Sequence, residues 1–216
     1  MATTFSPKII TDTWIEASWD DFIQATANPD YQKGKFYYYK GRLRIEMSPV
    51  GNDHARDHSI INSAINLYAG LMGINLNGND NCSYRKTGYQ EAQPDLSYYV
   101  GDSVNTIPYG TGIVSLDQFS APELVVEIAN TSLADDQGEK RLLYEELGIK
   151  EYWIVNVKKG EIVAFKIENE GSYRLRKSLV LSGLNLSILE EALKMSRETN
   201  HGKVMAWLLE KFKTHQ

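Results

Sequence analysis

The sequence predicts an α/β fold, and a strand, a helix and a second strand in the second half of the chain carry that prediction. The stretch "PELVVEIAN" (122–130) is typical of a strand buried on both faces, "DDQGEKRLLYEELG" (135–148) of a helix, and "EYWIVNV" (151–157) of another buried strand. A helix between two strands at this spacing forms a crossover unit. The two strands are therefore expected to be parallel neighbours, with the helix on one face of their sheet.

The remaining elements are predicted in chain order. The stretch "SWDDFIQAT" indicates a short helix with Ser18 as its N-cap, and "FYYYKGRLRIEM" indicates a hairpin that turns near Lys40. Residues 52–73 carry the apolar spacing of a helix with a wide buried face. Strands are expected at "CSYRK" and "PDLSYYV", a further hairpin at 161–180, and two helices at the end of the chain.

Length and composition favour one domain. The 216 residues suffice for one sizeable core, and no Pro/Gly/Ser-rich linker divides them. We expect a single domain over 1–216, with an N-terminal extension (1–17) and C-terminal helices (185–214) packed on it. A single cysteine excludes an internal disulfide framework and fits a reducing compartment. No signal peptide or stretch long enough to span a membrane is evident, so we expect a cytoplasmic protein without membrane contact.

The charge distribution bears on nucleic-acid binding. A net charge of −5 argues against a protein that coats nucleic acid non-specifically, because that mode needs a broadly basic surface. The net charge does not exclude a local groove for nucleic acid, since five basic residues, with no acidic residue among them, are interleaved with the four aromatic residues at 36–39. They are Lys33, Lys35, Lys40, Arg42 and Arg44. The alternative is that these charges are simply solvated on the outer face of a hairpin.

Three residues are the candidates for chemistry. Glu127 stands inside an apolar strand and faces its packed side, where an unpaired charge costs several kcal/mol. Lys140 begins the apolar stripe of the following helix, so its ammonium is expected to reach Glu127. Asp95 follows a proline at the start of a strand, and strand ends are where ligand sites of sheets often lie.

Two carboxylates on adjacent strands would bind a hard divalent cation, Mg²⁺ or Mn²⁺. Such a cation lowers the pKa of bound water and stabilises charge on a phosphoryl group, and the lysine would orient the attacking water. The competing interpretation is structural. Glu127 and Lys140 would then form a buried ion pair, and Asp95 would cap its own backbone.

A zinc site is the rival metal site. His54 and His58 stand four residues apart on one helix face, with Asp57 beside His58. The pattern is similar to the inverted zinc-hydrolase motif, but it has aspartate where that motif has glutamate, and no third ligand is evident. The sequence therefore argues against zinc.

Three stretches together, "GRLRIEMSPVGNDH", "QPDLSYYV" and "PELVVEIANTSLADDQGEKRLLYEELGIKEYWIVNV", resemble the Uma family of endonucleases. This family lies within the restriction-endonuclease-like PD-(D/E)XK superfamily, and the resemblance extends from about residue 19 to about residue 180. It implies a restriction-endonuclease-like core with a central mixed β-sheet flanked by helices, a divalent metal, Mg²⁺ or Mn²⁺, and hydrolysis of phosphodiester bonds in DNA.

The resemblance also assigns roles. Asp95 matches the aspartate of the Pro-Asp motif, and Glu127 matches the acid of the second motif, with the backbone carbonyl of Ile128 as a further metal ligand. The usual lysine two positions after that acid is replaced by Ala129. Lys140 resembles a lysine that has moved to the next helix, which Asp136 is expected to cap.

Three further residues fall on or near the family pattern. Tyr144 matches it, although a core aromatic residue would explain this position as well. His54 follows the "MSP" segment and is expected near the cleft, or else it is an ordinary polar residue of a first helical turn. The hairpin lacks the acid that often precedes its turn in the family. Glu46 is the candidate replacement, and the alternative is a solvent-facing strand residue.

The resulting prediction is a metal-dependent endodeoxyribonuclease with Asp95, Glu127 and Lys140 as its catalytic residues. The alternative is a catalytically inactive protein that keeps the nuclease fold for DNA binding, protein binding or dimerisation. Cleavage of both strands of a duplex would favour a homodimer, which matches the symmetry of the substrate.

Overall fold

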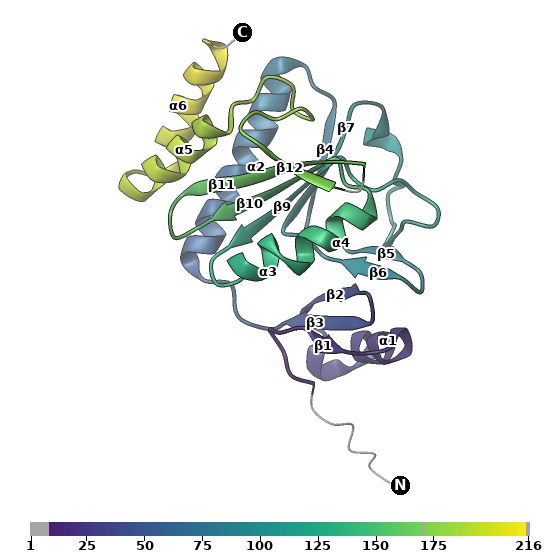
Figure 1. The fold of residues 1–216 in the computed structure, drawn as a ribbon. Helices are drawn as coiled ribbons and strands as arrows, with labels where there is room; N and C mark the ends of the chain where they lie inside the picture. Colours follow the sequence, from purple (N-terminus) through teal and green to yellow (C-terminus); the bar gives the residue numbers. More distant parts are fainter. Residues whose placement is uncertain (1–8, 170, 215–216) are drawn as a thin grey trace, which may run out of the picture.

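The computed structural model describes residues 9–169 and 171–214, whose strands form two mixed sheets (Figure 1). The central sheet has the order β12-β11-β10-β9-β7-β4, and the second sheet has the order β1-β3-β2-β6-β5-β8. The central strands are β4 (Leu76–Asp80), β7 (Leu96–Val100), β9 (Leu124–Ala129), β10 (Glu151–Asn156), β11 (Glu161–Glu168) and β12 (Gly171–Leu175). The second sheet contains β1 (Ile15–Glu16), β2 (Lys35–Tyr39), β3 (Arg42–Glu46), β5 (Tyr84–Lys86), β6 (Gln90–Ala92) and β8 (Val114–Ser115).

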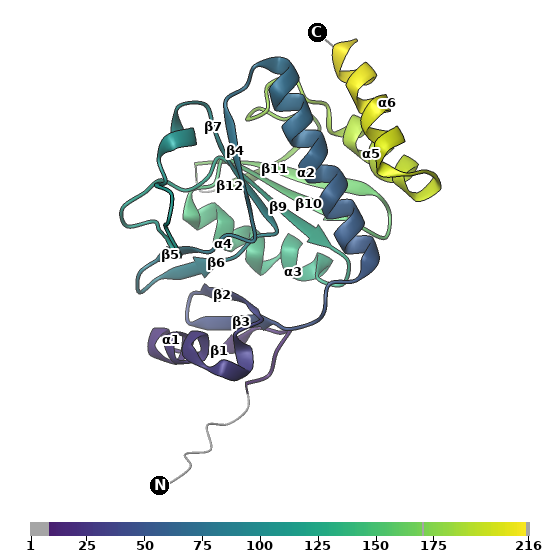
Figure 2. The same ribbon diagram turned by 180° about the vertical axis from the view of Figure 1, so that it is seen from behind.

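Helices cover both faces of the central sheet. Figures 1 and 2 show α2 on one face with α5 and α6 beside it, and α3 and α4 on the other face. Their bounds are α2 (Asn52–Met72), α3 (Leu133–Gln137), α4 (Glu139–Leu147), α5 (Leu186–Glu198) and α6 (His201–Lys213), while α1 (Trp19–Ala27) packs on the second sheet. Short 3₁₀ turns lie at Pro29–Tyr31 and Gly101–Asn105. The predicted α/β class and the mixed sheet flanked by helices are confirmed.

The crossover unit forms as predicted, with one difference. Strands β9 and β10 are parallel neighbours, and Glu127 lies opposite Ile154. The single helix expected between them is divided into α3 and α4 at Gly138. A Cβ atom at this position would lie 3.0 Å from the carbonyl oxygen of Ala134, so the tight junction favours glycine.

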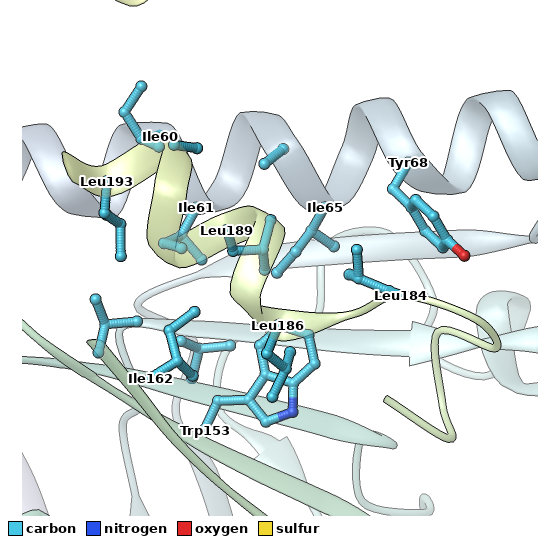
Figure 3. Packing of buried hydrophobic residues seen from close by; sticks show 14 of the residues in the cluster. Ile60, Ile61, Ile65, Tyr68, Trp153, Ile162, Leu184, Leu186, Leu189 and Leu193 are labelled. Atoms are coloured by element: carbon cyan, nitrogen blue, oxygen red, sulfur yellow. The ribbon is translucent and has the colours of Figure 1, made fainter. Parts of the chain in front are cut away.

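The two faces of β9 belong to different cores, as the alternation of its side chains predicts. Val126 and its neighbours two residues away pack into the cluster beneath α2 and α5, where Trp153 and Leu189 are fully buried (Figure 3). Val125 and Ala129 face α4 and the tyrosines of the second sheet. Glu127 shares this second side, so its carboxylate lies between the two sheets.

Segments near both ends of the chain contact these elements. Of the predicted N-terminal extension, residues 1–8 lie outside the described residues, whereas β1 pairs with β3. Helices α5 and α6 pack against α2. Within the described ranges, no helix is both long enough and apolar enough to cross a membrane.

Candidate active site

A cavity of about 510 Å³ opens between the two sheets and the first turn of α2. Its wall contains the three predicted catalytic residues and Ile128, and Tyr144 lies behind Glu127. The charged or ionisable residues of the wall include Lys35, Glu46, His54, Asp95, Glu127 and Lys140. Side chains that are up to 105 positions apart in the chain therefore meet in one place.

Strand register brings the two predicted carboxylates together. Strands β7 and β9 are antiparallel, with Leu96 opposite Val126. Asp95, one residue before Leu96, therefore lies at the level of Glu127, one residue after Val126. The predicted arrangement of two carboxylates on adjacent strands is present.

Asp95 is held by three kinds of group. Its Oδ2 accepts a hydrogen bond from the backbone N–H of Ile128 at 2.7 Å and lies 3.3 Å from Nε2 of His54. Its Oδ1 is ion-paired with the ammonium of Lys35. Burial by itself raises the pKa of this carboxyl, but the hydrogen bond from His54 and the charge of Lys35 outweigh burial and hold the pKa well below its ordinary value.

Glu127 is only 2% exposed and lies in a different environment. Its Oε1 accepts hydrogen bonds from the hydroxyls of Tyr144 at 2.6 Å and Tyr37 at 3.2 Å. Burial raises the pKa of Glu127 to about 8, with the negative charge of Asp95 adding to the effect and Lys140 opposing it. Two carboxylates side by side thus differ strongly in acidity, which is a common property of active sites.

Lys140 lies behind Glu127 and is 1% exposed. Its Nζ is 3.0 Å from Glu46, 3.0 Å from Asp136 and 3.6 Å from Glu127, and it lies over the ring of Tyr37. Burial lowers the pKa of Lys140, but the three carboxylates together raise it well above its ordinary value. The predicted contact between Lys140 and Glu127 is confirmed.

Other placements refine the sequence analysis. Glu46 contacts Lys140 instead of facing solvent, so it occupies the position expected of a replacement carboxylate. The prediction that Asp136 caps the helix of Lys140 is wrong, because α4 begins at Glu139 with Gly138 as its N-cap and no side-chain cap. Asp136 is instead fully buried, with its carboxylate between the ammonium of Lys140 and the hydroxyl of Ser132.

The two histidines of the pair have different partners. The rings of His54 and His58 lie 6.4 Å apart, and Nε2 of His58 is 3.3 Å from both Asp80 and the carbonyl oxygen of Asp95. Asp57 is separately engaged, with Oδ2 at 3.6 Å from Arg197. His54 does reach the cleft, as the sequence predicts.

Two residues of the site were not among the predicted ones. Lys35 and Tyr37 stand two positions apart on β2, so both side chains face the central sheet. The alternation of side chains along β2 indicates from the sequence alone that these two members of the basic and aromatic run share one face of the strand. Only the packing of the second sheet against β9 shows that this face is buried.

The donor atoms suit a hard divalent cation. Asp95 and Glu127 offer carboxylate oxygens to the same cavity, and no hydrogen bond or ion pair found in the described part of the chain involves Oε2 of Glu127. Mg²⁺ is commonly held by one or two carboxylates while keeping several waters. No cluster of three or more His, Cys, Asp or Glu side chains at metal-binding distances occurs within 9–169 and 171–214, so an all-protein cage of the zinc type is not formed there.

Comparisons with known proteins agree with this architecture. The Uma2 family model, described as "Putative restriction endonuclease", matches residues 19–204. A crystal structure described as a "putative nuclease belonging to DUF820" from Anabaena variabilis superposes with a TM-score of 0.56 and 17% identity. The match covers 82% of this chain and 98% of the other, and at this identity it shows a shared fold only. The comparison with curated proteins gave no match.

Proposed function

Since the chain belongs to the Uma2 family, whose description is that of a restriction endonuclease, we propose that it hydrolyses phosphodiester bonds in DNA with the aid of a divalent cation. The observation that carries this proposal is the meeting of Asp95 and Glu127 in one cavity with Lys140 behind them. The fold supports it as well, because a protein described as a nuclease shares it.

The proposed cation is Mg²⁺ or Mn²⁺, held by Asp95, Glu127 and the backbone carbonyl of Ile128. When bound, it supplies a water of lowered pKa and neutralises charge on the phosphate. In hydrolysis, the oxygen of water forms a bond to phosphorus and one ester P–O bond breaks. The water loses a proton, the leaving sugar oxygen gains one, and the products are a phosphomonoester and a hydroxyl group.

Lys140 has a defined part in this proposal. Its Nζ forms ion pairs with Glu46 and Asp136 at 3.0 Å each. The third partner, Glu127, lies at 3.6 Å, which is too long for a good hydrogen bond. A water beside Glu127 would accept a hydrogen bond from the ammonium, so Lys140 would orient the nucleophile while its ion pairs with Glu46 and Asp136 fix its position.

The test is nicking of supercoiled plasmid with Mg²⁺ or Mn²⁺. Wild-type protein is compared with Glu127→Gln and with Glu168→Gln, a matched control whose side chain is half exposed on β11, away from the cavity. Cleavage by wild type and control that is lost in Glu127→Gln and in EDTA supports the proposal. Equal cleavage by Glu127→Gln would refute the assignment of this site.

Metal binding is measured separately, by calorimetry with Mg²⁺ alone. Glu127→Gln is expected to bind the cation at least tenfold more weakly, because it loses an anionic ligand. If wild type binds DNA but neither binds Mg²⁺ nor cuts, the nuclease fold serves binding or dimerisation instead. We also propose a homodimer, since two symmetric sites match the two strands of a duplex, and sedimentation of the purified protein measures it directly.

A further inference from the structure

Two ammonium groups flank the paired carboxylates, and they differ in access to the cavity. The Lys140 side chain is 1% exposed and is enclosed by three carboxylates. The Lys35 side chain is 20% exposed, and it lines the cavity from the first position of β2. A substrate that enters the cavity therefore meets Lys35 before it meets Lys140.

The two lysines also differ in how their charge is balanced. Lys140 has three carboxylate partners, so its positive charge is fully compensated within the protein. Among the residues that the structure describes, Lys35 forms an ion pair only with Asp95, through Oδ1. The other oxygen of Asp95 is held by the Ile128 N–H and by His54, so Asp95 remains in place if Lys35 changes partner.

We propose that Lys35 is the phosphate-binding residue of this cleft and exchanges Asp95 for a non-bridging oxygen of a DNA phosphodiester. This inference rests on the proposed function, because it takes the phosphodiester as the ligand. Lysine binds phosphate as a mobile point charge, and its four-carbon stem allows the ammonium to turn from one oxygen to another. In the free protein, the ion pair with Lys35 compensates the charge of Asp95 in its buried position.

The exchange has a signature that a purely structural lysine would lack. While Lys35 is bound to Oδ1, it competes with a cation for Asp95, whereas a phosphate draws it away. Removing Lys35 is therefore expected to strengthen Mg²⁺ binding in the absence of DNA and to weaken DNA binding. A lysine that merely orients Asp95 for the metal would weaken both when removed.

The experiment uses Lys35→Ala and Lys35→Arg, with Lys166→Ala as the matched control. Lys166 is also a partly exposed strand lysine paired with one carboxylate, Glu168, and it lies outside the cavity. Thermal unfolding first establishes that each variant is folded. Mg²⁺ affinity is then measured by calorimetry, and the affinity for a 20-base-pair duplex is measured by fluorescence anisotropy with Ca²⁺ over a range of salt concentrations.

For Lys35→Ala we expect Mg²⁺ affinity to rise several-fold and DNA affinity to fall about tenfold, with the salt slope reduced by about 1. Lys35→Arg should retain DNA affinity within a few-fold, and Lys166→Ala should match wild type. DNA binding by Lys35→Ala equal to that of Lys166→Ala would overturn the proposal, and so would a fall in its Mg²⁺ affinity. Plasmid cleavage by wild type tests the nuclease proposal independently, since none of these binding measurements requires turnover.

Discussion

Replacing Lys140 with methionine removes the positive charge from the centre of the site while keeping most of the volume of the side chain. Three carboxylates within 3.6 Å would then lose their shared partner, and Asp136 and Glu127 are almost fully buried. Removing one partner of a buried ion pair costs about 3–5 kcal/mol. For a domain of this length, that corresponds to a fall in Tm of about 6–20 °C at pH 7.

The loss of stability in this variant should increase as the pH rises. Burial raises the pKa of Glu127 to about 8 and raises that of Asp136 above its ordinary value even with Lys140 present. Without the lysine, both carboxyls hold their protons more strongly in the native state. Between pH 5 and pH 8 the unfolded chain has already released these protons, whereas the native state still binds them. The free energy of unfolding of the variant therefore falls.

Urea unfolding at pH 5 and pH 8 measures this directly, with Lys166→Met as the control for loss of a partly exposed lysine. A cost below about 1 kcal/mol at pH 7, or a cost as large at pH 5 as at pH 8, would refute the charge network described for Lys140. Loss of stability is expected whether or not Lys140 acts in catalysis. Cleavage must therefore be compared at a temperature where the variant remains folded.

Three other predictions concern stability. Burial raises the pKa of Asp57 from 3.8 to about 6. The stabilisation of the native state by the protonated carboxyl is therefore present below pH 4 and is lost as the pH rises through 6. Asp57→Asn should remove the resulting fall of about 3 kcal/mol in the free energy of unfolding between pH 4 and 7, measured by urea titration. Leu189→Ala should cost about 2–5 kcal/mol, because this side chain of α5 is fully buried, whereas Leu179→Ala, at an exposed leucine, should cost little. Gly148 ends α4 with φ of 80°, so Gly148→Ala should cost about 1–2 kcal/mol in calorimetric unfolding although nothing lies within 4 Å of the added Cβ.

The sequence predicts the central sheet well because its signals are local. The apolar runs of β9 and β10, the helical spacing of α2 and the glycine that ends α4 are each visible within a few residues. The contact between Lys140 and Glu127 is also predictable, since a crossover helix packs back on the strand that precedes it.

Strands β1, β4, β6 and β8 were not predicted from the sequence, and the part that β2 plays in the site depends on contacts between the two sheets. Which face of β2 is buried depends on how the second sheet packs against β9 and α4, and no local pattern specifies that packing. Lys35 and Tyr37 therefore remained part of a basic and aromatic run, whereas the structure places one on Asp95 and the other on Glu127. The division of the crossover helix into α3 and α4 at Gly138 was also missed.

The burial of Glu127 follows from the charge balance of its surroundings. Four other carboxylates, Glu46, Asp95, Asp135 and Asp136, face three basic groups, Lys35, Arg44 and Lys140. The carboxylates already outnumber the basic groups, so an ionised Glu127 would add a further uncompensated negative charge. Burial is the main reason that the carboxyl retains its proton to about pH 8, and the negative charges of Asp95 and Asp136 add to the effect. Under the proposed function, a divalent cation compensates the same charge, and Glu127 can then be buried as an anion. The neighbouring residues thus leave Glu127 with a deficit of positive charge, as a metal ligand requires and a simple structural ion pair does not.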